Sequence, residues 1–253
     1  MLVLRSLAFL VYFYVVTVAL ALIAPFLRLR DWRDPLAHAR RWSRLVLAGL
    51  RTLCGIHWEV SGREHLPANG PALIACMHQS AFETFAWLQI APDVTYVVKE
   101  ELARIPIVGG LIRRAGLIVV DRKAGATALR RAMGDAKVAV AQGRSIVIFP
   151  EGTRVAPGRT VALQPGVAGI AASTGLAVIP VATDSGLFWG RRAFLKRPGT
   201  IHLAVMPPIA AGTPRAVLLA NLQDAFAAGR TLLGIPVDNS VGSPPHEFAS
   251  EAS

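Results

Sequence analysis

After residue 57 the chain alternates short apolar runs with segments of helical periodicity, and this alternation limits the folds that it can adopt. The apolar runs, which are rich in β-branched residues and predict strands, cover residues 57–62, 71–77, 94–98, 117–122, 145–150, 177–182 and 201–206. The helical segments cover residues 83–91, 104–114, 125–142, 165–174 and 214–228. Several strand candidates are continuously apolar, as in strands covered on both faces. The pattern predicts an α/β fold with a mainly parallel central sheet flanked by helices.

An uncharged apolar segment precedes the predicted sheet. Residues 7–27 are 21 residues without a charged side chain, which is about the length that crosses the hydrocarbon core of a bilayer. A cleaved signal peptide with Arg5 at its basic start is the alternative, but no small-x-small cleavage site is followed by a neutral or acidic mature sequence. The segment therefore predicts membrane association, and it is compatible both with spanning the bilayer and with lying at its interface.

Positive charge follows the apolar segment. Residues 1–57 carry eight arginines against two aspartates, which is +6 of the formal charge of +11. Residues 37–54 show a helical pattern with Arg40, Arg44 and Arg51 along one side and apolar residues along another. This pattern predicts a basic amphipathic helix among lipid head groups, at the cytoplasmic face of the (inner) cell membrane. An ordinary surface helix with a solvated basic face is the alternative.

Charge and cysteine content limit the partners and the compartment. A net charge of +11 favours an anionic partner, which is nucleic acid, an acidic membrane surface or a phosphorylated substrate. Cys54 and Cys76 lie in apolar contexts away from clustered metal ligands, which indicates buried thiols in a reducing compartment. We divide the chain into membrane-anchoring helices at 1–56, an α/β domain at 57–236, and a polar tail at 237–253 that we expect to be disordered.

Four of the predicted strands end in polar side chains. These segments run from His78 to Glu83, from Asp121 to Arg122, from Glu151 to Arg154, and from Thr183 to Gly186. In α/β sheets, functional groups gather in the loops beyond the strand ends. The four segments are therefore the candidates for a functional site.

The segment from His78 to Glu83 supports two interpretations. Residues 80–83 have the S-x-x-E pattern of a helix capping box, which explains Ser80 and Glu83 without a catalytic role. A continuous helix would leave His78 and Glu83 roughly 140° apart, so they can meet only if His78 lies in the bend before the helix. Because the cap enforces that bend, it is compatible with a pair in which imidazole removes a proton from an alcohol and the carboxylate orients it.

Candidate anion ligands follow other strands. In "FPEGTR", Gly152 allows backbone N–H groups to face an anion, and Arg154 can bind a phosphate through two hydrogen bonds. A turn after a buried strand explains the same residues. A strand-end ion pair explains Asp121 with Arg122, and a solvated side chain explains Lys99. Each of these motifs is unspecific by itself.

Taken in order along the chain, the motifs resemble those of the 1-acylglycerol-3-phosphate acyltransferases of the glycerolipid acyltransferase superfamily. The resemblance covers roughly residues 57–210. His78 and Glu83 match the family's His-x4-acid block, residues 99–122 are similar to its second block, "IFPEGTR" matches the third and "VIPVA" the fourth. Two positions depart from the pattern: Glu83 stands where aspartate is more usual, and Gln164 where the family often has lysine.

The resemblance implies an activity and roles for individual residues. His78, oriented by Glu83, would act as general base on the free hydroxyl of a lysophospholipid, which would take its acyl group directly from acyl-CoA or acyl-carrier protein. It implies no metal, no cofactor and no nucleic-acid partner, and it implies membrane docking through the N-terminal helices. The acceptor's phosphate would bind at cationic side chains and the loop between strand and helix: Lys99, Arg122, Glu151, Gly152, Thr153 and Arg154.

Three other functions are compatible with part of the sequence. An acyltransferase for a different lysolipid, such as a lyso-ornithine lipid, is compatible with Gln164. A serine esterase would use Ser80 or Ser185 as nucleophile, but the chain has no G-x-S-x-G elbow. A basic membrane-binding protein without catalysis would leave the spacing of His78 and Glu83 unexplained.

Overall fold

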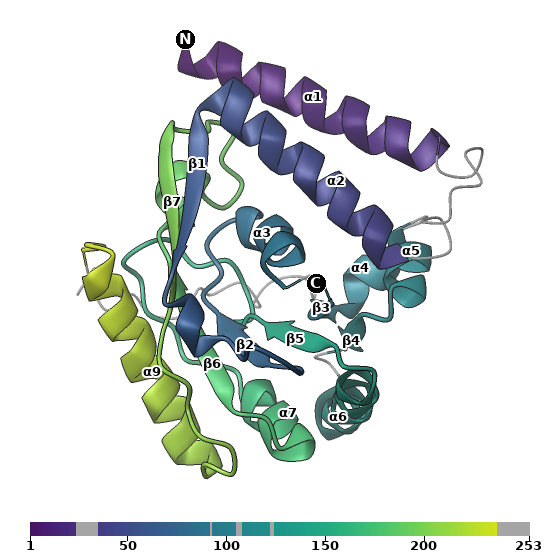
Figure 1. Ribbon diagram of the computed structural model, residues 1–253, viewed down its shortest axis with the longest axis vertical. Coiled ribbons are helices and arrows are strands. Elements are labelled where there is room, and N and C mark those ends of the chain that lie inside the picture. Colours follow the sequence, from purple (N-terminus) through teal and green to yellow (C-terminus); the bar gives the residue numbers. More distant parts are fainter. Residues whose placement is uncertain (24–34, 92, 105–107, 122–123, 237–253) are drawn as a thin grey trace, which may run out of the picture.

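A seven-stranded sheet with strand order β1-β7-β6-β2-β5-β3-β4 forms the centre of the molecule (Figure 1). The computed structural model describes residues 1–23, 35–91, 93–104, 108–121 and 124–236. The strands are β1 (Ile56–Ser61), β2 (Leu73–Cys76), β3 (Val94–Lys99), β4 (Ile118–Val120), β5 (Ser145–Ile148), β6 (Val178–Thr183) and β7 (Gly199–Val205). Each lies within a few residues of a strand predicted from the sequence.

The strands are mainly parallel, as predicted. β2 pairs in parallel with both β5 and β6, and β3 pairs in parallel with β5 and β4. β6 and β7 pair antiparallel, and β7 continues the sheet through a parallel pairing with β1. Because parallel strands end at the same edge, the segments that follow β2, β3, β5 and β6 come together there. The predicted α/β class is confirmed.

Helices cover both faces of the sheet and enclose two apolar cores (Figure 1). Alternate residues of β2 point to opposite faces, with Ile74 in the core under α3 and Leu73 in the core under α7. This double burial explains why the strands are continuously apolar. The helices are α1 (Leu2–Ile23), α2 (Pro35–Gly49), α3 (Phe82–Ile90), α4 (Glu100–Arg104), α5 (Val108–Arg114), α6 (Gly125–Ala141), α7 (Gly166–Thr174), α8 (Ser185–Phe188) and α9 (Arg215–Leu232), with short helical turns η2 (Leu50–Cys54) and η3 (Arg63–His65).

One predicted helix can be compared only in part. The helix predicted at 104–114 overlaps the end of α4 and contains α5, and its residues 105–107 lie outside the described residues. The short helix α8 follows β6 and was not predicted.

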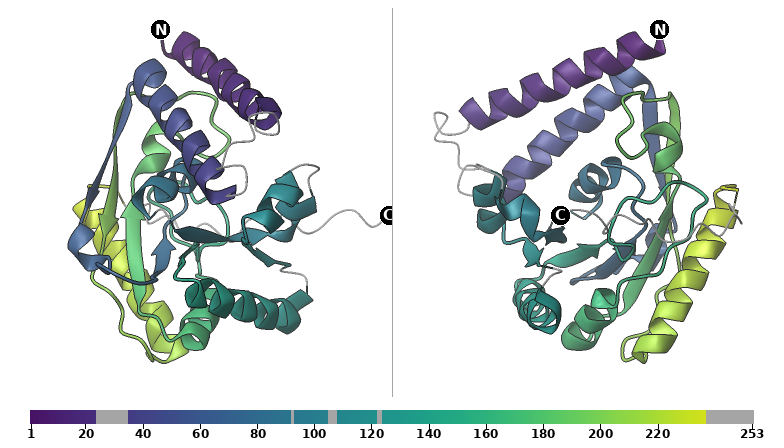
Figure 2. Two further views of the ribbon diagram at one scale, coloured as in Figure 1. Left: turned by 45° about the vertical axis from the view of Figure 1, so that its right-hand side comes forward. Right: turned by 180° about the vertical axis from the view of Figure 1, so that it is seen from behind.

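The N-terminal helices pack against the sheet domain and share its core. Phe9 of α1 is buried with Val46 of α2 and Leu50 of η2. The Tyr12 hydroxyl donates to the Leu45 carbonyl (2.9 Å), so α1 runs alongside α2 (Figures 1 and 2). The other side of α1 exposes an apolar stripe at helical spacing: Leu4, Leu7, Val11, Tyr14, Val15, Val18 and Leu22. One side of this helix therefore packs against the rest of the protein, and the other exposes apolar side chains at the molecular surface.

The predicted N-terminal segments match these helices in part. Leu2–Leu22 is long and apolar enough to cross a membrane. The end of the predicted apolar segment, residues 24–27, lies outside the described residues, as does the predicted disordered tail 237–253. The predicted basic helix at 37–54 corresponds to α2 and η2, which ends where Gly55 adopts a left-handed conformation (φ +68°). A glycine is favoured there because side chains strain that conformation.

Candidate active site

His78 follows β2 in the bend before α3, and both of its backbone polar groups are fixed. Its N–H donates to the Glu151 carboxylate at 2.6 Å, and its carbonyl accepts from the Val155 N–H at 2.7 Å. Its ring stacks on Phe149, with ring centroids 4.0 Å apart and planes inclined by 20°. The loop after β5 therefore fixes His78 at its backbone N–H, at its carbonyl and on one face of its ring.

Glu83, in the first turn of α3, meets His78 as predicted. His78 Nδ1 lies 3.0 Å from Glu83 Oε2, and the Glu83 side chain is fully buried. The Ser80 N–H donates to both carboxylate oxygens at 3.1 Å, and the Ser185 hydroxyl donates to Oε1. Three donors thus fix the orientation of one carboxylate: two come from the bend before α3 and one from the start of α8.

The helix start differs from the capping box that the sequence predicts. The Ser80 hydroxyl accepts from the Phe82 N–H (3.1 Å), two residues ahead, and Ala81 takes the cap position. Half of the capping box is therefore present, because the Ser80 N–H donates to the Glu83 carboxylate. The other half is replaced by a local turn, which the Ser80 hydroxyl closes. Starting the helix one residue later keeps His78 outside it.

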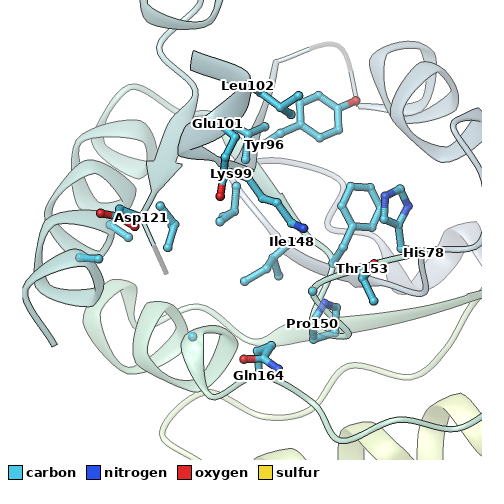
Figure 3. Close-up of a pocket in the computed structure, with 18 of the residues that line it drawn as sticks. His78, Tyr96, Lys99, Glu101, Leu102, Asp121, Ile148, Pro150, Thr153 and Gln164 are labelled. Carbon is cyan, nitrogen blue, oxygen red and sulfur yellow. The ribbon is translucent and has the colours of Figure 1, made fainter. Parts of the chain in front are cut away.

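The hydrogen bonds determine which nitrogen of His78 can act as a base. A carboxylate only accepts, so the Nδ1 that faces Glu83 carries the proton. Nε2 is then the acceptor nitrogen of a ring that borders a cavity (Figure 3). A neutral imidazole held in this tautomer can remove a proton from a hydroxyl placed in that cavity.

The cavity beside His78 has a volume of about 690 Å³. It lies between β3, β4, α6, α7 and the loop after β5 (Figure 3). Apolar side chains form much of its wall: Leu102, Leu117, Val120, Leu129, Ile148 and Ile170. Charged side chains also line it, with four cations (Lys99, Arg154, Arg191 and Arg192) outnumbering two carboxylates (Glu101 and Asp121). A cavity of this composition suits a molecule that has both an anionic group and an aliphatic chain.

The structure brings together some of the predicted phosphate ligands. Lys99, Thr153 and Arg154 line the cavity together with Gly152, while Arg122 lies outside the described residues. The N–H of Gly152 itself is already used within the loop, because it donates to the Phe149 carbonyl at 2.9 Å. Gly152 forms the turn, at a φ of +73° that disfavours other residues.

Glu151 does not line the cavity. Its side chain is buried and supports the His78 backbone, so it shapes the loop and does not contact a bound phosphate. Burial raises the pKa of Glu151 to about 8; the nearby Glu83 carboxylate acts in the same direction, while the His78 N–H and the Arg230 guanidinium oppose it. The folded protein thus holds a proton here at neutral pH.

Glu151→Gln is expected to change how stability depends on pH. Between the ordinary value of 4.5 and about 8, folded Glu151 keeps a proton that the unfolded chain loses, so its raised pKa makes the free energy of unfolding fall as pH rises. Glutamine removes this dependence and can still accept from the His78 N–H. Melting temperatures between pH 5 and pH 9 should therefore diverge in favour of the variant as pH rises. The exposed Glu64→Gln variant is the control. If the difference in melting temperature between Glu151→Gln and the unmutated protein stayed constant with pH, as expected for this control, the interpretation would be contradicted.

Two residues of the site escaped the sequence analysis in their true roles. From the sequence, Ser185 was a candidate only as a nucleophile, but in the structure it is fully buried and its hydroxyl donates to Glu83. Ser80 is also fully buried, and its hydroxyl accepts from the Phe82 N–H at the start of α3. Neither serine lies open to a substrate, which argues against an esterase. Gln79 accepts from the Gly186 N–H at 3.0 Å and so ties the segment after β6 to the segment after β2. Only the sheet order, which places β6 beside β2, reveals these contacts.

Metal ligands and thiols are not part of this arrangement. Within the described ranges, no group of three or more His, Cys, Asp or Glu side chains is placed to hold a metal ion. Cys54 and Cys76 are free and buried, and burial raises the pKa of the Cys76 thiol.

Comparison with known proteins places the site in a family. The family model described as Acyltransferase matches residues 57–184, which contain His78, Glu83 and the loop after β5. The chain is 30% identical to the 1-acyl-sn-glycerol-3-phosphate acyltransferase of Pseudomonas aeruginosa over 83% of each chain. It is 28% identical to the alpha enzyme of that name from Mus musculus, over 66% of this chain and 59% of the relative.

A solved structure shares the fold. The 1-acyl-sn-glycerophosphate acyltransferase PlsC from Thermotoga maritima superposes with a TM-score of 0.72 at 22% identity, covering 92% of this chain and 98% of that one. The resemblance seen in the sequence motifs is confirmed, and the chain belongs to the acyltransferase family.

Proposed function

We propose that this chain transfers a fatty acyl group from acyl-CoA or acyl-carrier protein to the free hydroxyl of 1-acylglycerol-3-phosphate, giving phosphatidic acid. The observation that carries the proposal is the His78–Glu83 pair, 3.0 Å apart, at the wall of a cavity lined by both cations and aliphatic side chains. The relatives named for this reaction support the choice of acceptor.

The proposed reaction is a direct transfer. His78 Nε2 takes the proton of the acceptor hydroxyl as its oxygen attacks the thioester carbonyl carbon, and the Glu83 carboxylate stabilises the imidazolium that forms. The carbon–oxygen bond forms, the carbon–sulfur bond breaks, and the leaving thiolate takes the proton from His78. Neither Ser80 nor Ser185 takes part as a nucleophile, since both are buried.

We assign phosphate binding to the cations of the cavity. Lys99 and Arg154 come from the ends of β3 and β5, the edge at which His78 also lies. A guanidinium can bind a phosphate with two hydrogen bonds, and a lysine adds a point charge.

Arg154→Ala is expected to raise the KM for the phosphate-bearing acceptor about ten- to a hundredfold, because a hydrogen bond to a charged group contributes roughly 1.5–3 kcal/mol. The KM for the acyl donor should change little. Initial rates with each substrate varied in turn measure both constants. Arg159→Ala removes an exposed arginine of the same loop that is outside the cavity wall, and it should leave both constants unchanged. Equal effects of Arg154→Ala on donor and acceptor would indicate a general structural role.

The acceptor itself needs a direct assay, because Gln164 lines the cavity where the family often has a lysine. Purified protein should be offered 1-acylglycerol-3-phosphate, lysophosphatidylethanolamine and a lyso-ornithine lipid, each with acyl-CoA and with acyl-carrier protein. We expect the highest kcat/KM with 1-acylglycerol-3-phosphate. Preference for the lyso-ornithine lipid would assign the chain to the same chemistry with another acceptor.

We propose that residues 1–56 dock the enzyme on the cytoplasmic face of the cell membrane, with domain 57–236 in the cytoplasm. The Tyr12 hydroxyl donates to the Leu45 carbonyl (2.9 Å), and the Trp42 ring N–H donates to the Thr17 hydroxyl (3.0 Å), so α1 is held along α2 at its middle and in its second half. Its exposed apolar stripe would then enter one leaflet instead of crossing both. Arginines of α2 would lie at the anionic head groups.

A further inference from the structure

The connection from α8 to β7 exposes apolar and cationic side chains together. In this segment, residues 187–197, the exposed fractions of Leu187, Phe194 and Leu195 are 46%, 43% and 36%. Arg191, Arg192 and Arg197 are exposed between and beside them. Large aliphatic and aromatic groups beside several arginines are typical of protein surfaces that enter the head-group region of a membrane.

This segment is joined to α1. The Lys196 N–H donates to the Ser6 hydroxyl at 2.9 Å. The Lys196 ammonium lies 5.7 Å from the centre of the Phe9 ring and 5.4 Å from that of Trp189, and the two rings contact each other edge to face. Lys196 itself is only 4% exposed, so it forms part of the joint. The segment and the first turns of α1 lie at the same end of the sheet, away from most of α9 (Figures 1 and 2).

The joint brings the exposed apolar side chains of the segment close to the first turns of α1. Phe194 and Leu195 directly precede the residue that Ser6 binds, and Leu4 and Leu7 of the exposed stripe flank Ser6. Exposed apolar side chains on two neighbouring elements, bordered by arginines, are better suited to contact with an anionic membrane than to exposure to water. Lipid already covers the α1 stripe in the proposed function.

The same segment reaches the cavity. Arg191 and Arg192 line it, in a turn closed by a hydrogen bond from the Ala193 N–H to the Gly190 carbonyl (3.1 Å). Arg192 has a φ of +56°, the one positive φ among the non-glycine residues that the structure describes. The segment thus carries apolar groups beside α1 and two guanidinium groups at the cavity within a few residues.

We propose that residues 187–197 form a second membrane contact, which inserts Phe194 and Leu195 into an anionic bilayer beside α1 and places Arg191 and Arg192 at the level of the head groups. The inference rests on the membrane docking proposed above. It explains why a loop outside the recognised motifs supplies cations to the cavity: an acceptor lipid would pass from the bilayer to the site along this loop.

An environment-sensitive label tests the insertion of Leu195 directly. Because Cys54 and Cys76 are buried, a new exposed cysteine can be labelled with a nitrobenzoxadiazole dye in the full-length protein. Leu195→Cys tests the segment, Val11→Cys reports on α1, and Leu232→Cys is an exposed control on α9. The unmutated protein gives the background labelling. Each protein is mixed with vesicles of phosphatidylglycerol and phosphatidylethanolamine, with and without lipids that carry a quencher on their acyl chains.

The expected result is that the labels at positions 195 and 11 shift to shorter wavelength and are quenched by the acyl-chain quencher, while the label at 232 is unchanged. With phosphatidylcholine alone the shift at 195 should shrink, since the arginines lose their anionic partners. If the label at position 195 is unchanged, like the label at 232, while the label at position 11 shifts and is quenched, the second membrane contact does not exist and the docking through α1 stands. If neither 195 nor 11 inserts, membrane docking itself fails. A response of 195 to acyl-carrier protein, and not to vesicles, would assign the segment to a protein partner and overturn the proposal.

Discussion

His78→Ala should lower the turnover of acyl transfer by about 10²- to 10⁴-fold, the range expected for loss of a general base. His78 lines the cavity, and its Nδ1 lies 3.0 Å from Glu83 Oε2, which leaves Nε2 as the nitrogen available to act as a base. Alanine leaves both backbone hydrogen bonds of residue 78 in place, since these go to Glu151 and from Val155. The fold should therefore survive, although the ring that stacks on Phe149 is lost.

A second histidine provides a matched control for this experiment. His202 on β7 also pairs with a carboxylate, with its Nδ1 2.8 Å from Asp184 Oδ2, but it is outside the cavity wall. His202→Ala should leave kcat close to that of the unmutated enzyme. Initial rates with saturating donor and acceptor, together with thermal unfolding, measure both variants. Activity of folded His78→Ala within tenfold of the unmutated enzyme would remove His78 from its assigned role.

Glu83→Gln should have the second largest effect, a loss of kcat on the order of 10³- to 10⁴-fold. The estimate follows the loss of about 10⁴ when the carboxylate of a serine-protease triad is replaced by its amide. Glutamine keeps the shape and can still accept from the Ser80 N–H, which is 3.1 Å from both oxygens of Glu83. It removes the negative charge that stabilises the imidazolium, and its amide nitrogen can donate to Nδ1 and so favour the wrong tautomer of His78.

Stability and pH dependence separate this role from that of a helix cap. A cap contributes about 1 kcal/mol, so the free energy of unfolding of Glu83→Gln should change by no more than that. The profile of kcat against pH should change shape, because the variant loses the charge beside its base. Ser185→Ala removes a donor but leaves the charge, and it should cause a smaller loss than Glu83→Gln. A fully active Glu83→Gln enzyme would return this segment to helix capping alone.

Much of the fold could be predicted because both faces of the sheet are covered. Strands buried on two sides must be continuously apolar, and that pattern located several of the strands, including β5 (Ser145–Ile148) and β6 (Val178–Thr183). The contact of His78 with Glu83 could also be predicted, since it depends on the local geometry of a helix start. Local sequence thus determined the strands and this pair.

Other features of the site depend on strand order, which local sequence does not reveal. Ser185 reaches Glu83 from 102 residues away, because β6 lies beside β2. Glu151 looked like part of an anion site from its motif, and only burial against His78 showed its supporting role. Arg191 and Arg192 belong to no motif, and their place in the cavity wall depends on the path of a loop between α8 and β7 that local sequence does not reveal.

The central claim is that His78 activates a lipid hydroxyl for direct attack on an acyl thioester, and a single-turnover experiment tests it most directly. Excess enzyme is mixed with acyl-CoA or acyl-carrier protein that carries a labelled acyl group, with or without 1-acylglycerol-3-phosphate, and quenched at short times. We predict that the label passes from thioester to phosphatidic acid in one phase, that none becomes bound to protein, and that His78→Ala slows this phase at least a hundredfold. Label on the protein before acceptor is added, or equal rates for the two proteins, would contradict the mechanism.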